Sequence, residues 1–226
     1  MKRRHLRTMT DSSTAHHITP DITGAASARL EKFSATVAST TWYDITVNGK
    51  NGTANNASLY SDFMFNGINN TVATAIEAPL LPATNTWTLQ IWTNRLGSGT
   101  LASTKDGNNG WALRDSPADA NLEYSSFPYN GIHIAAPATT GWFHLALTWT
   151  PGAPPAIKSY VDGVLYSTMS GPPAVGDYNP LGQPLVIGSG TAGFYTGNID
   201  TVRVYSRALS PDEILRDYHA GKPAHP

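Results

Sequence analysis

The acidic residues of this 226-residue chain are the first place to look for catalytic chemistry. Hydrolysis of a glycosidic bond needs two carboxylates across the scissile bond, and residues two apart on a β-strand lie on one face. Asp115 and Asp119 flank a proline in a predicted loop, where any pairing of the two would be accidental. None of the four glutamates has an acidic residue two positions away; they are Glu31, Glu77, Glu123 and Glu213. The acidic residues therefore do not favour a glycoside hydrolase.

Other catalytic arrangements are also missing from the sequence. The chain has no cysteine, which excludes a thiol nucleophile, a disulfide framework and thiolate metal sites. No serine lies in a nucleophile-elbow sequence. His144 is the only histidine in a strong predicted strand, and a buried structural histidine is a simpler interpretation than a base that needs an orienting acid. The segment Gly188-Ser189-Gly190 leads into a strand and not a helix, so it is not a phosphate-binding loop. We expect no enzymatic activity.

Alternating hydrophobic segments predict the elements that would position any binding site. Residues 86–93 (TWTLQIWT) and 142–149 (WFHLALTW) alternate in the manner of strands with one buried face. Residues 157–167 form a predicted hairpin with Asp162-Gly163 in a type I′ turn. Only 14% of the residues are charged, and 20 glycines and 16 prolines supply turns. This composition predicts an all-β domain of many short strands.

The C-terminal segment predicts a strand followed by a short helix. Residues 198–205 are rich in β-branched and aromatic side chains, as in a strand. Ser210 is a suitable N-cap, Pro211 suits the first helical position, and the acidic pair Asp212-Glu213 suits the positive end of the helix dipole. Gly221, followed by Pro223, is expected to end the helix.

Four motifs in this chain resemble one family. The closing sequence has Ile199-Asp200, Val202-Arg203-Val204-Tyr205, Arg207-Ala208-Leu209-Ser210 and Glu213-Ile214, and it resembles the closing signature of the concanavalin A-like lectin/glucanase superfamily, in particular its laminin G-like domains. The opening TTWYD and NGKNGT segments, the 142–149 strand and the 157–167 hairpin resemble other family motifs in the family's order, with Thr46-Val47 replacing the usual Ser-Gly. The resemblance implies a two-sheet antiparallel jelly-roll sandwich over residues 25–226, with a short C-terminal helix.

The opening loop is a candidate calcium site. Asn and Gly residues adopt left-handed backbone conformations readily, so residues 48–53 predict a tight loop with exposed carbonyl groups. Calcium prefers several oxygen ligands, and the candidates are Asp44, Asn48, Asn51 and, if the family's terminal strand passes this loop, Asp200. Alternatively, these side chains only stabilise the loop, and no cofactor is required.

Aromatic side chains are the candidates for contact with a ligand. A carbohydrate-binding domain would need exposed aromatic residues that converge with polar groups. Trp92 lies on the polar face of its strand, where it either packs against a covering element or stacks on a ligand, and packing is favoured. The full candidate set is Trp92, Trp111, Tyr129, Tyr178 and Tyr195.

Residues 1–24 form a polar arm that cannot bury a core. The arm has four basic residues that are candidates for docking onto an assembly: Lys2, Arg3, Arg4 and Arg7. This cluster is a weak phosphate footprint, and a net charge of -1 argues against nucleic-acid or membrane partners. No apolar stretch follows the basic start as in a signal peptide, and none is long enough to span a membrane.

These observations predict a non-enzymatic structural or binding protein. The specific expectation is a phage virion component, such as a capsid decoration, fibre or tail protein, because the opening motif resembles copies common in phage proteins. Its expected partners are other virion subunits, a second copy of itself and a host glycan. The alternative is a carbohydrate-binding lectin domain of a bacterial surface or secreted protein, and a glycoside hydrolase is the least favoured interpretation.

Overall fold

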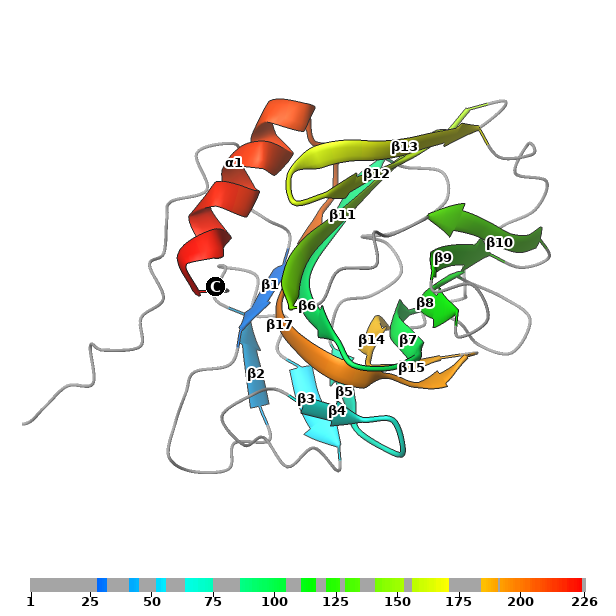
Figure 1. Cartoon of the computed structure of the whole chain (residues 1–226), viewed down its shortest axis with the longest axis vertical. Helices are drawn as coiled ribbons and strands as arrows, with labels where there is room; N and C mark the ends of the chain where they lie inside the picture. The colour runs from blue at the N-terminus through cyan, green and yellow to red at the C-terminus, as the bar shows by residue number, and fades with distance from the viewer. Residues whose placement is uncertain are drawn as a thin grey trace, which may run out of the picture.

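The computed structural model is a sandwich of two mainly antiparallel sheets that pack face to face (Figure 1). This confirms the predicted fold class. The structure describes residues 28–31, 41–44, 52–55, 64–74, 86–104, 111–116, 121–126, 129–134, 141–152, 156–170, 184–190 and 192–224. The predicted arm, residues 1–24, lies outside these ranges.

The first sheet is centred on two long strands, β6 and β17. Its strands follow the order β2, β1, β17, β6, β11, β12, β13, and β4 pairs with the first part of β17. Their bounds are β1 Ala28–Glu31, β2 Thr41–Asp44, β4 Met64–Asn66, β6 Trp87–Arg95, β11 Trp142–Thr150, β12 Ala156–Val161, β13 Val164–Ser170 and β17 Thr196–Tyr205.

The second sheet follows the order β2, β3, β5, β14, β7, β8, β9, β10. Because β2 pairs with β1 in one sheet and with β3 in the other, it joins the two sheets along one side. A small hairpin of β15 and β16 lies beside β7. The bounds are β3 Gly52–Asn55, β5 Thr71–Thr74, β7 Gly99–Ser103, β8 Trp111–Ser116, β9 Asn121–Ser126, β10 Tyr129–Ile134, β14 Val186–Ile187, β15 Ser189–Gly190 and β16 Gly193–Phe194.

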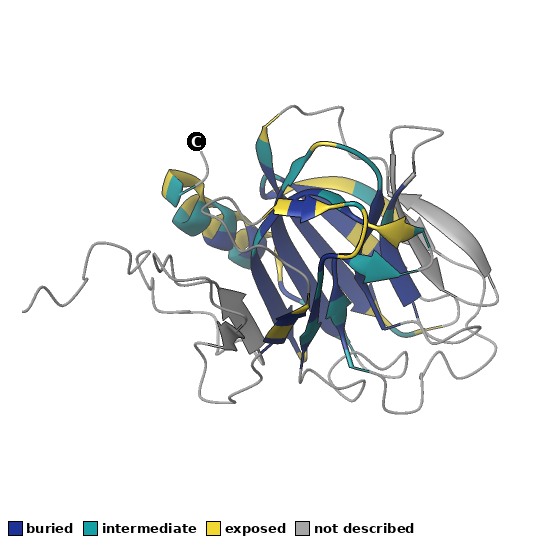
Figure 2. Cartoon of the chain, turned by 90° about the horizontal axis from the view of Figure 1, so that it is seen from below, coloured by how far each residue is buried: buried dark blue, intermediate teal, exposed yellow. Residues whose placement is uncertain are grey.

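The core lies between the sheets. β6 and β11 are buried on both faces over most of their lengths, which corrects the prediction of one buried face, and buried residues are dark blue in Figure 2. Trp87 stacks between two further tryptophans, with ring centroids 5.5 Å from Trp111 and 6.3 Å from Trp149. This row of indole rings connects the two sheets, because Trp87 and Trp149 lie in the first sheet and Trp111 in the second.

The hairpin between β12 and β13 has the predicted turn. Asp162 and Gly163 have φ values of 51° and 79°, as a type I′ turn requires. The Asp162 carboxylate also accepts a hydrogen bond of 2.9 Å from the backbone N–H of His144 on β11. The turn is therefore tied to the neighbouring strand as well as to its own hairpin.

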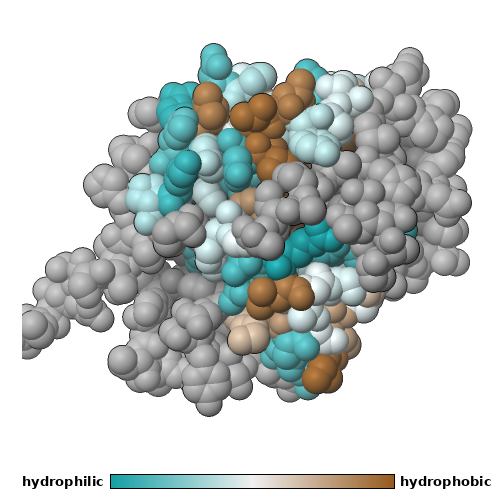
Figure 3. All heavy atoms as spheres, in the orientation of Figure 1, coloured by the Kyte–Doolittle hydropathy of each residue, from teal (hydrophilic) through white to brown (hydrophobic). Residues whose placement is uncertain are grey.

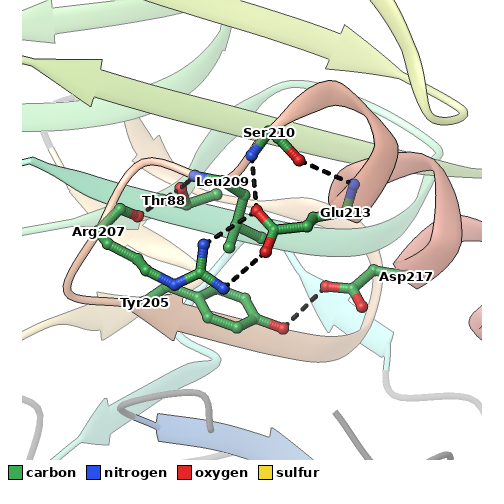
Figure 4. Close-up of polar contacts among 7 residues, drawn as sticks. All are labelled: Thr88, Tyr205, Arg207, Leu209, Ser210, Glu213 and Asp217. Atoms are coloured by element: carbon green, nitrogen blue, oxygen red, sulfur yellow. Dashed lines mark hydrogen bonds and ion pairs between the residues drawn. The ribbon is translucent and has the colours of Figure 1, made fainter. Parts of the chain in front are cut away.

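The chain ends in helix α1, Pro211–Gly221, followed by a short 3-10 turn over Lys222–Ala224. Ser210 is the N-cap: its hydroxyl accepts a hydrogen bond from the Glu213 N–H, and the Glu213 carboxylate accepts one from the Ser210 N–H at 2.8 Å (Figure 4). Arg207 donates two hydrogen bonds of 2.9 Å to the same carboxylate. The Glu213 carboxylate thus accepts hydrogen bonds from both the helix N-cap and Arg207. The helix begins at Pro211 and ends at Gly221, as predicted.

These contacts lower the pKa of Glu213 to about 2, chiefly through the Arg207 hydrogen bonds. A carboxyl group whose pKa is lower in the folded state stabilises the fold above its ordinary pKa and loses that contribution as the pH falls towards 2. We expect Glu213→Gln to cost about 1 kcal/mol at pH 7, a small value because both side chains are partly exposed to solvent. Unfolding free energies measured between pH 6 and pH 2 should decline less steeply for this variant than for the wild type. Asp212→Asn is the control, and parallel curves for wild type and Glu213→Gln would contradict the assignment.

Helix α1 covers the outer face of the first sheet (Figure 1). Its buried Ile214 packs with Leu209 and with Ala146, Tyr160 and Tyr205 of the sheet. The Tyr205 hydroxyl donates a hydrogen bond of 2.8 Å to the buried Asp217 carboxylate. In the described part of the chain, no helix is long and apolar enough to span a membrane.

Candidate functional site

Three of the five aromatic candidates for ligand binding are core residues. This confirms the favoured packing of Trp92 and corrects the expectation for Trp111 and Tyr195. Trp92, Trp111 and Tyr195 are only 2%, 2% and 1% exposed. Trp92 is covered by α1, where its ring stacks on Tyr218 at a centroid distance of 5.7 Å, and Trp111 stacks on Trp87. None of the three can offer a ring face to a ligand in this structure. Tyr178 and the side chain of Tyr129 lie outside the described residues.

The structure describes only some of the predicted calcium ligands. Leu30 on β1 pairs with Asp44 on one side and with Val202 on the other, so β1 lies between the strands of Asp44 and Asp200. Two strand spacings, about 9–10 Å, separate these strands. Asn48, Asn51 and the Asp44 side chain lie outside the described residues, as do Lys2, Arg3, Arg4 and Arg7. Within the described ranges, no group of three or more His, Asp or Glu side chains could hold a metal ion. The calcium site stays a prediction.

Among the residues that the structure describes, the candidate ligand-binding surface is a loop rim at one end of the sandwich. We define the loop rim as residues 66–70, 96–98 and 193–196, which come from three separate connections. The Gly67 N–H donates to the Tyr195 carbonyl at 2.9 Å, and the Thr196 N–H donates to the Ser98 carbonyl at 3.0 Å. A Cβ atom at Gly67 would collide with the Thr196 hydroxyl, so the first and third segments approach closely only because residue 67 is glycine.

The loop rim exposes apolar and amide side chains together. Ile68 and Leu96 are 70% and 60% exposed, and Phe194 is 36% exposed. Asn66 and Asn69 are exposed beside them. Hydrophobic (brown) and polar (teal) side chains lie next to one another at this lower end of the molecule in Figure 3. The loop rim thus exposes apolar side chains beside two amides whose oxygens accept hydrogen bonds within the first rim loop.

The first rim loop is held in one conformation by its asparagines. The Asn66 side-chain carbonyl accepts hydrogen bonds from the backbone N–H groups of Ile68 at 2.9 Å and Asn69 at 3.1 Å. The Asn70 side chain accepts one from the Asn66 N–H at 2.8 Å. This network fixes Ile68 at the exposed tip of the loop, so the loop is ordered before any ligand binds.

Below the rim, an ion pair joins the two sheets. Arg95, at the end of β6, forms a bidentate hydrogen-bonded pair with Asp115 of β8, one bond of which is 2.6 Å. Burial raises the pKa of Asp115, while the Arg95 hydrogen bonds and charge act in the opposite direction. The desolvation cost of this carboxylate is therefore large. Removal of either partner would leave an uncompensated buried charge and destabilise the fold.

A second polar contact supports the same end of the sandwich. The Thr93 hydroxyl donates to the Asn198 carbonyl at 2.8 Å, so the Tyr195 hydroxyl must donate to the Thr93 oxygen, also at 2.8 Å. Burial raises the pKa of Tyr195, which keeps this phenol protonated. Tyr195 thus anchors the third rim segment in the core while its neighbours Phe194 and Thr196 reach the surface.

Sequence reasoning missed the loop rim. Ile68, Leu96 and Phe194 are single apolar residues in polar or glycine-rich loops, and no periodicity marks them. The one available signal was residue type, because each of the three is a large apolar residue next to a glycine. Only the folded chain brings the three loops together.

Comparisons with known proteins agree with this sandwich. A sequence model described as the concanavalin A-like lectin/glucanases superfamily matches residues 65–215. No curated protein matches the sequence significantly.

Several solved structures are similar to this chain. One is domain 4 of AbnA, a GH43 extracellular arabinanase from Geobacillus stearothermophilus in complex with arabinotriose, which is 20% identical with a TM-score of 0.60, covering 84% of this chain and 97% of that one. A Trypanosoma rangeli sialidase is 15% identical with a TM-score of 0.62, covering 87% of this chain and 32% of its own. The botulinum neurotoxin serotype D binding domain is 16% identical with a TM-score of 0.61, covering 86% of this chain and 50% of its own. The chain thus spans half or less of the last two proteins, and at these identities the likeness is one of fold.

Proposed function

Because the chain belongs to the concanavalin A-like lectin/glucanases superfamily, we propose that it is a non-enzymatic binding protein whose loop rim contacts a glycan. The observation that carries this proposal is the convergence of three loops that present Ile68, Leu96, Phe194 and two exposed asparagines on an ordered backbone. Sugars offer apolar C–H faces, for which the loop rim has Ile68, Leu96 and Phe194 as partners. The similar arabinanase domain is described in complex with arabinotriose, which supports an oligosaccharide as the ligand class.

The non-enzymatic part of the proposal is supported by the contacts of three of the described carboxylates. Asp115 is bound by Arg95, Glu213 by Arg207 and Asp217 by the Tyr205 hydroxyl. Each of these acids forms a structural contact and is not one of two carboxylates that flank a glycosidic bond, as hydrolysis would need. A protein that binds a glycan and releases reducing sugar from it would contradict this part of the proposal.

The test of the rim is glycan binding by matched variants. We expect the wild type to bind a subset of an immobilised glycan array, and Phe194→Ala to weaken the best interaction about tenfold, the loss of roughly 1.4 kcal/mol expected for one stacking contact. Leu215→Ala is the control, because Leu215 is 37% exposed, as Phe194 is at 36%, but lies on α1. Equal affinities for wild type and Phe194→Ala would show that the glycan does not bind at the loop rim. A folded wild type that binds no glycan would contradict the proposed function.

We further propose that the sandwich is displayed on a virion, with residues 1–24 as its anchoring arm. This rests on the basic and polar composition of the arm and on the resemblance of the opening motif to phage proteins. A bacterial surface or secreted lectin is the alternative, and both roles are compatible with glycan binding.

Deletion of residues 1–24 tests the anchoring role. We expect the truncated protein to fold with an unchanged melting temperature, because the arm cannot contribute a hydrophobic core, and to lose incorporation into particles. Quantification of the protein in purified particles checks this. Undiminished incorporation without the arm would contradict the proposal.

A further inference from the structure

We infer that the ligand of the loop rim is an uncharged glycan, which lies against the rim with a C–H face, and that sialylated and sulfated glycans bind there weakly. The inference rests on the proposed function and adds the chemical class of the ligand. It is supported by the charge of the rim, by the pairing of the cations near it and by the use of its backbone N–H groups.

No residue of the loop rim carries a charge. Its three segments have the sequences NGINN, LGS and GFYT. The large side chains that it exposes are apolar, since Ile68, Leu96 and Phe194 are 70%, 60% and 36% exposed. A carboxylate or sulfate that moves from water onto such a surface loses hydration and gains no ion pair. The C–H face of an uncharged sugar, in contrast, gains from contact with the same side chains.

The cation nearest to the rim along the chain is already paired. Arg95 directly precedes Leu96 of the rim, and its guanidinium forms the bidentate pair with Asp115. To bind an acidic sugar instead, this guanidinium would have to leave a carboxylate that is 1% exposed without its partner. The cost of an uncompensated buried charge opposes that exchange.

Arg114 is the second described cation to consider. Thr100 of β7 pairs with Arg114 on one side and with Phe194 on the other, so two strand spacings, about 9–10 Å, separate the backbones of Arg114 and Phe194. Arg114 also pairs in register with Glu123 of β9, so an acidic residue occupies the neighbouring position. A direct test of anion binding must therefore include Arg114.

The backbone N–H groups of the rim are largely used within the protein. Several N–H groups that point outward together can bind a carboxylate without any cation. Here seven rim N–H groups donate to acceptors of the described chain: those of Asn66, Gly67, Ile68, Asn69, Leu96, Tyr195 and Thr196. The conformation that orders the rim thus consumes the donors that an acidic sugar would need.

The part of the sequence that holds the rim is acidic. Residues 51–202 include all three rim segments, and their four basic and nine acidic residues give a net charge of -5. The whole chain has a net charge of only -1, because the other eleven Lys and Arg residues belong to residues 1–50 and 203–226. A negative local field opposes the approach of an anionic ligand.

The test compares matched glycans on the wild-type protein. The probe is an array that carries each oligosaccharide in an uncharged, a sialylated and a sulfated form. We expect the uncharged form to bind about tenfold more tightly than either acidic form. An acidic form that binds as tightly as its uncharged parent, and is weakened by Phe194→Ala, would overturn the inference while the proposed function stands. A wild type that binds no form would contradict the proposed function and the inference with it.

Two variants test whether charge causes the discrimination. Asn69→Lys adds a cation at an exposed rim position and keeps the backbone N–H that orders the loop, so it should reduce the preference for the uncharged form about threefold. Leu215→Lys adds the same charge on α1 and is the control. Equal preferences in the two lysine variants would contradict the inference. Arg114→Gln should leave the affinity for the acidic forms unchanged, and a loss of that affinity would instead identify Arg114 as an anion-binding residue and overturn the inference.

Discussion

Replacement of Asp115 by alanine is expected to lower the free energy of unfolding by about 3–5 kcal/mol, the usual cost of breaking a buried ion pair. The Asp115 side chain is 1% exposed and its partner Arg95 is 14% exposed, so the variant leaves a guanidinium group in a nearly dry site. Urea denaturation at pH 7 measures the change. Because the pair joins β6 of one sheet to β8 of the other, its loss also weakens the contact between the sheets below the loop rim.

The cause of this effect can be separated from a general loss of packing. Asp212→Ala removes an exposed carboxylate from the first turn of α1, and it should cost less than about 1 kcal/mol. The double variant Arg95→Met/Asp115→Leu removes both charges at once, and it should recover much of the stability lost in Asp115→Ala. A double variant as unstable as the single one would mean that the site depends on shape and not on charge.

The longest strands and the helix could be predicted because their signals are local. β6 and β11 alternate over many residues, and β17 is rich in β-branched and aromatic residues. The Ser210–Glu213 capping box together with Pro211 defines the helix start within one turn. The turn at Asp162-Gly163 is equally local, since positive φ values favour these residue types. In each case neighbouring residues in the sequence determine the structure.

Short strands without a sequence pattern could not be predicted. β5 has the sequence TVAT, and β15 and β16 are two residues each. They exist because neighbouring strands supply hydrogen-bonding partners, as when β5 pairs with both β3 and β14. The loop rim escaped prediction for the same reason, because its three loops meet only through contacts with Tyr195 and Thr196.

Trp92 shows why periodicity alone did not identify a binding residue. The alternation of β6 correctly placed Trp92 on the face opposite the core, where it had either to be covered or to bind a ligand. What covers it is α1, a helix near the end of the chain, and no pattern within β6 encodes that contact. The packing of this side chain was favoured from the sequence, and the element that covers it was not predicted.

We therefore expect Trp92→Ala to lower the free energy of unfolding by about 3–5 kcal/mol, as for other buried aromatic side chains. Trp92 fills the space between the first sheet and α1, where its ring contacts His144 at a centroid distance of 5.3 Å and Tyr218 at 5.7 Å. The backbone at Gly221 comes so close that a Cβ atom there would collide with the indole nitrogen. Without the indole ring, α1 should open first, so hydrogen exchange should accelerate in residues 211–221 more than in β6.

The comparison of Trp92→Ala with Phe194→Ala distinguishes a core residue from a binding residue. Phe194 is exposed on the loop rim, so its replacement should change the free energy of unfolding by less than about 1 kcal/mol while weakening glycan binding. Trp92→Ala should do the reverse, because the folded fraction keeps the rim loops and their contacts with Thr196. An unchanged unfolding free energy for Trp92→Ala, combined with lost glycan binding, would instead make Trp92 the stacking platform and would require α1 to leave the sheet when the ligand binds.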